Sequence, residues 1–106
     1  SNTFRTGVVG LSKTLATEVA EYNILVNTVA PGRILTDRVQ SLDSLKAEKS
    51  GLSLDEVQNQ SRKTIPLGRY GKPEEFGAVV AFIASDKCSY VNGTSIIVDG
   101  GMVKSI

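Results

Sequence analysis

Histidine is absent from this sequence of 106 residues, and so is tryptophan. Without histidine, serine–histidine–aspartate and cysteine–histidine catalysis are excluded, and most zinc sites lose their usual nitrogen ligand. The single cysteine, Cys88, cannot form a disulfide within the chain. A lone cysteine favours a reducing, cytoplasmic setting, and no metal site is expected.

Charge of one sign and long apolar runs are also missing. The chain has 12 basic and 11 acidic residues, a net charge of +1, and the basic residues are scattered. This distribution offers no basic patch for nucleic acid or for an anionic membrane. No apolar run approaches the roughly 18 residues of a transmembrane helix, and a signal peptide is not expected from this sequence. With 41% apolar residues, one small domain is expected.

What is present begins with a helical pattern. Apolar side chains recur at spacings of three and four at Phe4, Val8, Leu11, Leu15 and Val19, which places them on one helix face. A domain rarely begins inside a helix, so the chain reads as part of a longer protein, called here the parent.

Two glycines interrupt this helical pattern, Gly7 and Gly10. Each costs up to ~1 kcal/mol relative to alanine inside a helix. Either that cost is simply tolerated, or another segment packs closely against the glycines, and close packing is the favoured interpretation.

Two apolar stretches are predicted to be strands. Residues 24–30 are apolar on both alternating faces, which is typical of a parallel strand covered on both sides, and residues 94–99 form a second strand with a glycine exit. Between them lie a polar segment, residues 37–63, with a capping-box pattern at Ser53 and Glu56, and a helix starting at Pro73. Two parallel strands joined by a crossover helix form a right-handed βαβ unit. The pattern therefore predicts an α/β fold in the order helix, strand, helical segment, helix, strand.

The first predicted strand ends abruptly at Pro31 and Gly32, and Thr36 follows four residues after the glycine. In open α/β sheets, ligands bind beyond the carboxyl ends of the strands. Glycine lets a ligand approach the backbone, and Thr36 offers a hydroxyl and an N–H at the start of a helical segment. The competing interpretation is an ordinary strand-to-helix turn with Thr36 as the N-cap. These residues alone leave both interpretations open.

Three stretches together resemble the C-terminal part of a short-chain dehydrogenase/reductase, particularly the 3-oxoacyl-acyl-carrier-protein reductases: GVVGLSKTLATEVAEYNILVNTVAPGRILT, IPLGRYGKPEEFGAVVAFIASD and YVNGTSIIVDGG. This family is a single doubly wound parallel-sheet (Rossmann) domain. The resemblance implies that residues 1–106 are the C-terminal portion of such a domain, with a substrate-side lid over residues 37–64. It also implies that the parent uses NAD or NADP to reduce a small-molecule carbonyl or to oxidise a secondary alcohol.

The same resemblance assigns cofactor-binding residues. Pro31, Gly32 and Thr36 match the segment that lines the nicotinamide end of the cofactor, and the backbone around Ala30 and Ile34 would lie against the nicotinamide ring and carboxamide. The family's glycine-rich dinucleotide loop belongs to an N-terminal half that this sequence does not contain. The chain alone is therefore expected to be inactive.

Other positions are expected to serve structure and association. Asn27 is interpreted as a satisfied core amide, and residues 99–101 match the exit of the family's last strand. Family members associate through the central helix and the last helix–strand pair, so a homo-oligomer, dimer or tetramer, is expected. The unpaired edge of the strand predicted at residues 24–30 also argues against an isolated monomer.

The catalytic pair departs from the family pattern. Aligned on Gly7, the family's Tyr-x-x-x-Lys pair falls on Ser1 and Arg5. In the family chemistry the tyrosine exchanges a proton with the substrate oxygen, and the lysine lowers the pKa of the phenol. Arg5 keeps the positive charge, but its planar fork does not replace an ammonium, and Ser1 is a poor proton donor. Two hypotheses remain. The first is an oxidoreductase parent, for which Arg5 favours a divergent member with a rearranged acid. The second is a non-catalytic relative or fragment that acts mainly in subunit association.

Overall fold

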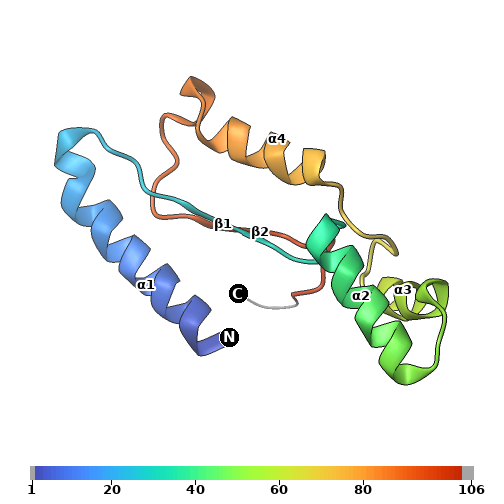
Figure 1. Cartoon of the computed structure of the whole chain (residues 1–106). Coiled ribbons are helices and arrows are strands. Elements are labelled where there is room, and N and C mark those ends of the chain that lie inside the picture. The colour runs from blue at the N-terminus through green and yellow to red at the C-terminus, as the bar shows by residue number, and fades with distance from the viewer. Residues whose placement is uncertain (1, 104–106) are drawn as a thin grey trace. The chain divides into compact units, whose positions relative to one another are not determined.

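The computed structural model describes residues 2–103, and the side chains of residues 6–103 (Figure 1). The elements along the chain are α1 (Asn2–Val19), a 3₁₀ turn (Ala20–Tyr22), β1 (Thr28–Pro31), α2 (Asp37–Ser50), α3 (Leu54–Lys63), α4 (Pro73–Ile83), a second 3₁₀ turn (Asp86–Cys88) and β2 (Ser95–Val98). This order confirms the prediction of helix, strand, helical segment, helix and strand.

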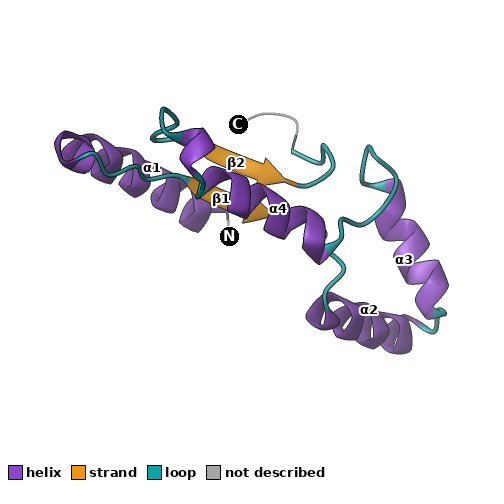
Figure 2. Cartoon of the chain, turned by 90° about the horizontal axis from the view of Figure 1, so that it is seen from above, coloured by secondary structure: helices purple, strands orange, loops and turns teal. Residues whose placement is uncertain are grey.

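The two strands form one parallel pair, and their arrows point the same way in Figure 2. The Thr28 N–H donates to the Thr94 carbonyl and, four residues on, the Gly32 N–H donates to the Val98 carbonyl, both at 2.9 Å. Both strands are shorter than predicted. The Gly93 N–H also donates to the Val26 carbonyl at 2.9 Å, but Gly93 has a φ of +72°, and the regular strand begins only at Thr28.

The chain divides into two compact units. The first, called the strand unit, contains residues up to 30 together with residues 78–97. The second, called the lid unit, contains residues 31–77 and those from 98 onward. The lid unit therefore holds both strand exits, helices α2 and α3, and the start of α4.

Asparagine side chains tie the strand unit together. The Asn27 amide donates from Nδ2 to the Val91 carbonyl and accepts at Oδ1 from the Thr94 N–H, both at 2.9 Å. Asn92 accepts from the Val26 N–H at 2.9 Å and donates to the Ala16 carbonyl at 3.3 Å. The prediction that Asn27 is a satisfied amide is confirmed.

The apolar face predicted along α1 is largely uncovered in the described chain. Leu11 is 70% exposed and Leu15 is 43% exposed. A Cβ atom placed at Gly7 or Gly10 meets nothing within 4 Å, so the described residues do not make the close packing that these glycines suggested. Close packing against these glycines stays a prediction for the parent.

The lid unit has a small core of its own. Helices α2 and α3 pack against each other, and Val57 (1% exposed), Ala47 and Ile65 are buried. The predicted capping box is present: the Glu56 N–H donates to Ser53 Oγ at 3.1 Å, and the Ser53 N–H donates to Glu56 Oε1 at 3.2 Å. The segment predicted as a lid, residues 37–64, is thus a helical hairpin.

Candidate functional site

The site predicted from the sequence lies where β1 leaves the sheet. The Gly32 N–H donates a hydrogen bond to the Val98 carbonyl, and a Cβ atom at Gly32 would lie 2.8 Å from Asp99 Cα. Only glycine fits so close to the second strand exit. The glycine is therefore explained by the packing of Asp99, whereas the sequence suggested the approach of a ligand.

The segment that follows is fixed to a loop ahead of α4. The Leu35 N–H donates to the Gly71 carbonyl and the Gly71 N–H donates to the Arg33 carbonyl, both at 2.9 Å. The Ile34 side chain is 6% exposed, and a Cβ at Gly71 would lie 2.7 Å from its Cδ1. The Ile34 side chain is thus largely buried against Gly71.

Thr36 is the N-cap of α2. Its Oγ1 accepts a hydrogen bond from the Val39 N–H at 3.2 Å, which confirms the turn interpretation. A hydroxyl both accepts and donates, so this bond leaves the hydroxyl proton for another acceptor. The capping role and a contact with a ligand are therefore compatible.

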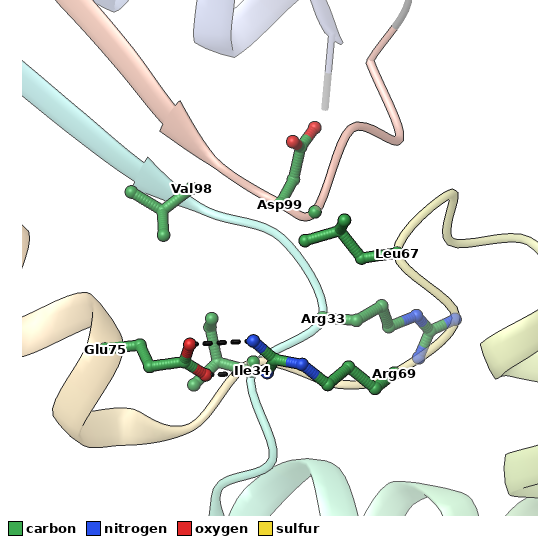
Figure 3. Close-up of a pocket in the computed structure, with 9 residues that line it drawn as sticks. Arg33, Ile34, Leu67, Arg69, Glu75, Val98 and Asp99 are labelled. Atoms are coloured by element: carbon green, nitrogen blue, oxygen red, sulfur yellow. Dashed lines mark hydrogen bonds and ion pairs between the residues drawn. The ribbon is translucent and has the colours of Figure 1, made fainter.

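A small cavity of about 110 Å³ adjoins this segment (Figure 3). Its lining comes from the two strand exits, the loop ahead of α4 and the start of α4: Arg33, Ile34, Leu67, Arg69, Gly71, Glu75, Val98, Asp99 and Gly100. Pockets for cofactors and drug-sized ligands span roughly 300–1,000 Å³, so this cavity alone does not hold a nicotinamide cofactor.

A bidentate ion pair closes one side of the cavity (Figure 3). Arg69 donates to the two Glu75 oxygens at 2.8 and 2.9 Å, and Glu75 also accepts from the Lys72 N–H at 2.9 Å. The hydrogen bond from Arg69, with that from the Lys72 backbone, lowers the pKa of Glu75 to about 2. The pair is exposed and contributes little stability, but it fixes the loop to the first turn of α4.

Sequence reasoning missed a buried carboxylate in the lid. Asp43 on α2 is 4% exposed and accepts a hydrogen bond from the Tyr70 hydroxyl at 2.7 Å. Tyr70 is 27 residues away along the chain, so no local spacing marks the pair. An aspartate on a polar helix is ordinarily a solvated residue, and only the burial of α2 against its neighbours distinguishes this one.

The structure describes the predicted cofactor-binding residues but not the side chains of the two predicted catalytic residues. Residues 30–36 form one continuous segment at the end of β1, which contains Ala30, Pro31, Gly32, Ile34 and Thr36. Arg5 lies within the bounds of α1, but its side chain and the whole of Ser1 fall outside what is described. Among the described residues, no group of histidine, cysteine or acidic side chains could hold a metal ion, and no helix is long and apolar enough to cross a membrane.

Parallel strands joined through a crossover helix are typical of open α/β proteins, in which ligands bind beyond the carboxyl ends of the strands. A sequence model of the family described as Enoyl-(Acyl carrier protein) reductase matches residues 2–103. The chain belongs to this family, within the short-chain dehydrogenases/reductases, and the predicted fold class, a C-terminal portion of a doubly wound Rossmann domain, is confirmed.

Two curated relatives share a name. The chain is 48% identical over 99 residues to the 3-oxoacyl-[acyl-carrier-protein] reductase FabG of Thermotoga maritima, covering 93% of this chain and 36% of that protein. It is 42% identical over 101 residues to the protein of the same name from Aquifex aeolicus, covering 95% and 36%. The chain thus spans about a third of the length of the curated relatives it matches.

Two solved structures resemble this chain in both fold and sequence. A short chain dehydrogenase family protein from Francisella tularensis matches with a TM-score of 0.87 and 39% identity, over 92% of this chain and 40% of that one. The L-sorbose reductase of Gluconobacter frateurii, solved with NADPH and L-sorbose, matches with a TM-score of 0.90 and 32% identity, over 99% of this chain and 40% of that one.

Proposed function

We propose that this chain is the C-terminal part of an NAD- or NADP-dependent oxidoreductase that reduces a carbonyl or oxidises a secondary alcohol of a small molecule. The observation that carries the proposal is the strand exit. Residues 30–36 run from a parallel strand directly into the lid helix, and Thr36 keeps a hydroxyl proton for an acceptor. The nicotinamide cofactor, when bound, supplies or accepts the hydride.

Most backbone N–H groups of the strand exit are already used in hydrogen bonds within the chain, which limits the donors left for a cofactor. The N–H groups of Gly32, Ile34, Leu35 and Thr36 all donate within the chain. We assign the Thr36 hydroxyl as a donor to the carboxamide oxygen, while Ala30 and Pro31 offer surface to the ring. The pyrophosphate and adenosine sites belong to the part of the relatives that this chain does not span.

Among carbonyl substrates, we favour a 3-oxoacyl thioester carried by acyl carrier protein, as in fatty acid biosynthesis, because the curated relatives are named for that reaction. The lid exposes Leu42 (52%) and Leu45 (51%) on α2, an apolar surface suited to an acyl chain. A cytoplasmic homo-oligomer remains part of the proposal. The exposed apolar faces of the strand unit and the single cysteine support it.

One observation favours a second candidate, a non-catalytic relative that acts in subunit association. Ser1 and Arg5 stand at the positions where the family places tyrosine and lysine. An enzyme parent would then need its proton donor elsewhere in the full-length protein.

The test is made on the full-length parent. Consumption of NADH and NADPH is followed with an acetoacetyl thioester and with a sugar ketone as substrates. Turnover with either cofactor supports the oxidoreductase. A folded protein that binds neither cofactor below about 10 µM would instead establish the non-catalytic relative.

Thr36 is tested by three substitutions. Thr36→Asp keeps a side-chain acceptor for capping but loses the donor, so cofactor binding should weaken by about 0.5–1.5 kcal/mol while the helix cap is retained. Thr36→Ser keeps both roles and should bind normally. Thr64→Val removes a lid hydroxyl that bonds the Ser61 carbonyl, and it serves as the control.

A further inference from the structure

The Asp43 carboxylate lies in the middle of the lid unit, almost completely removed from water at 4% exposure. Burying a charge is costly unless partners compensate for the lost hydration. The Tyr70 hydroxyl donates to Oδ2 at 2.7 Å, and Gln58 Nε2 lies 3.4 Å from the same oxygen. The Arg33 guanidinium lies 4.0 Å from Oδ1 and supplies the opposite charge.

These partners come from separate segments. Asp43 is on α2, Gln58 is on α3, Tyr70 is in the loop ahead of α4, and Arg33 belongs to the strand exit. Gln58 also donates to Gln40 Oε1 at 2.9 Å, which joins the two lid helices a second time. One carboxylate therefore connects both lid helices to the segment that leaves β1.

Tyr70 is itself held in place. Its side chain is buried, with 7% exposure, and the Arg62 guanidinium lies 5.8 Å from the ring centroid. Burial raises the pKa of Tyr70, so the phenol stays protonated and able to donate. The bond to Asp43 is the short, charge-assisted kind, which is stronger than a bond between neutral groups.

We propose that Asp43 is a positioning residue that fastens the substrate lid to the strand exit, through Tyr70 on one side and Arg33 on the other. This inference rests on the proposed function of the strand exit. With the fastening intact, α2 and α3 stay ordered next to Thr36 and the backbone of residues 33–36. When it is lost, the binding-competent lid becomes a smaller fraction of the population, and apparent affinity falls by that fraction.

The first test compares two tyrosines in the full-length protein. Tyr70→Phe removes the hydroxyl that bonds Asp43, whereas Tyr90→Phe makes the same change at a fully exposed side chain. Trypsin cleavage at Lys46 and Lys49 in the lid should become about tenfold faster in Tyr70→Phe and stay unchanged in Tyr90→Phe. The substrate KM should rise about tenfold with kcat within about twofold of the wild type, a split that general loss of structure does not produce.

The second test uses the carboxylate. Asp43→Asn keeps an acceptor for Tyr70 but removes the charge that faces Arg33, so cleavage and KM should lie between those of the wild type and Tyr70→Phe. Asp86→Asn, at an exposed site in the strand unit, controls for the lost charge. If Tyr70→Phe does not fold, the cleavage rate and KM of Asp43→Asn test the proposal.

Wild-type cleavage rates in both Tyr70→Phe and Asp43→Asn would overturn the inference. If the wild-type protein turns over no substrate, the proposed function fails, while the cleavage comparison still decides whether Asp43 fastens the lid.

Discussion

The lid unit and the strand unit differ in how far each covers its own side chains. The lid unit leaves Leu42 and Leu45 exposed, but it buries Val57, Ile65 and Tyr70 and surrounds the buried Asp43 carboxylate with hydrogen-bond partners. Among the described residues of the strand unit, the only buried apolar side chains are Ala16 and Cys88.

In the strand unit, α1 and α4 expose large apolar side chains, and β1 contains a buried hydroxyl without a hydrogen-bond partner in the described chain. Leu11 on α1 and Phe82 on α4 expose 70% and 54% of their surface. The buried Thr28 hydroxyl finds no hydrogen-bond partner within the described chain, although buried polar groups are nearly always satisfied. The comparison indicates that the lid is organised by its own sequence, whereas the strand unit depends on surface supplied from outside these 106 residues.

The largest effect is expected from crowding the second strand exit. Gly100 has φ +67°, and a Cβ there would lie 2.8 Å from Ile65 Cγ2, so Gly100→Ala should cost about 3 kcal/mol from left-handed strain and overlap. Gly77→Ala is the control, because its Cβ meets nothing within 4 Å and alanine favours the helix by roughly 0.5–1 kcal/mol. Urea denaturation measures both, and equal effects would mean that the exit is not tightly packed.

Truncating one apolar side chain in each unit should have unequal effects on stability. Val57→Ala in the lid unit should lower the free energy of unfolding by about 2 kcal/mol, from lost burial and the cavity left behind. Leu11→Ala in the strand unit should change it by less than about 0.5 kcal/mol in the 106-residue chain, because that side chain is already exposed.

In the full-length parent the second result should change. There Leu11→Ala should cost about 2–5 kcal/mol, as expected for a leucine covered by the rest of the domain. A small cost in both settings would show that the face of α1 has no partner in the parent.

The cap of α3 gives a smaller effect. Ser53→Ala removes the acceptor of the Glu56 N–H and should cost about 1 kcal/mol. Ser44→Ala, in the middle of α2 and exposed, should be neutral or slightly stabilising. Far-ultraviolet circular dichroism during urea denaturation measures both stabilities. Equal shifts of the urea midpoint in the two variants would show that the capping box does not stabilise the lid.

The smallest effect comes from the exposed Arg69–Glu75 pair. Because the pKa of Glu75 falls from 4.5 to about 2 on folding, its contribution is present above pH 4.5 and is lost as the pH falls toward 2. Glu75→Gln should flatten the dependence of the urea midpoint on pH in that window. Glu74→Gln, the neighbouring exposed acid, should leave the slope as in the wild type.

Local signals in the sequence predicted much of the fold. The Pro73 start of α4, the Ser53–Glu56 box and the turn at Pro31 each depend on residues a few positions apart, and each was found where predicted. The start of the first strand was wrong by four residues, because the regular strand depends on the geometry of a partner segment about 70 residues away along the chain, which no local pattern near residue 24 reveals.

The candidate site was predictable only in part. The continuous segment 30–36 carries its signal in one stretch of sequence, so its location was accessible. The roles of Gly32 and Asp43 were not, because each is decided by a residue far along the chain: Asp99 against Gly32, and Tyr70 against Asp43. Contacts of this kind depend on tertiary packing rather than on spacing.

Amide hydrogen exchange of the 106-residue chain, followed residue by residue by NMR, tests the central comparison most directly. The Leu35 and Gly71 amides, which bond across the strand exit in the lid unit, should exchange at least about 100-fold more slowly, relative to their intrinsic rates, than those of Leu11 and Leu15 on α1. Equal protection in α1 and at the strand exit would contradict the claim that the lid unit is organised by its own chain while the strand unit is not.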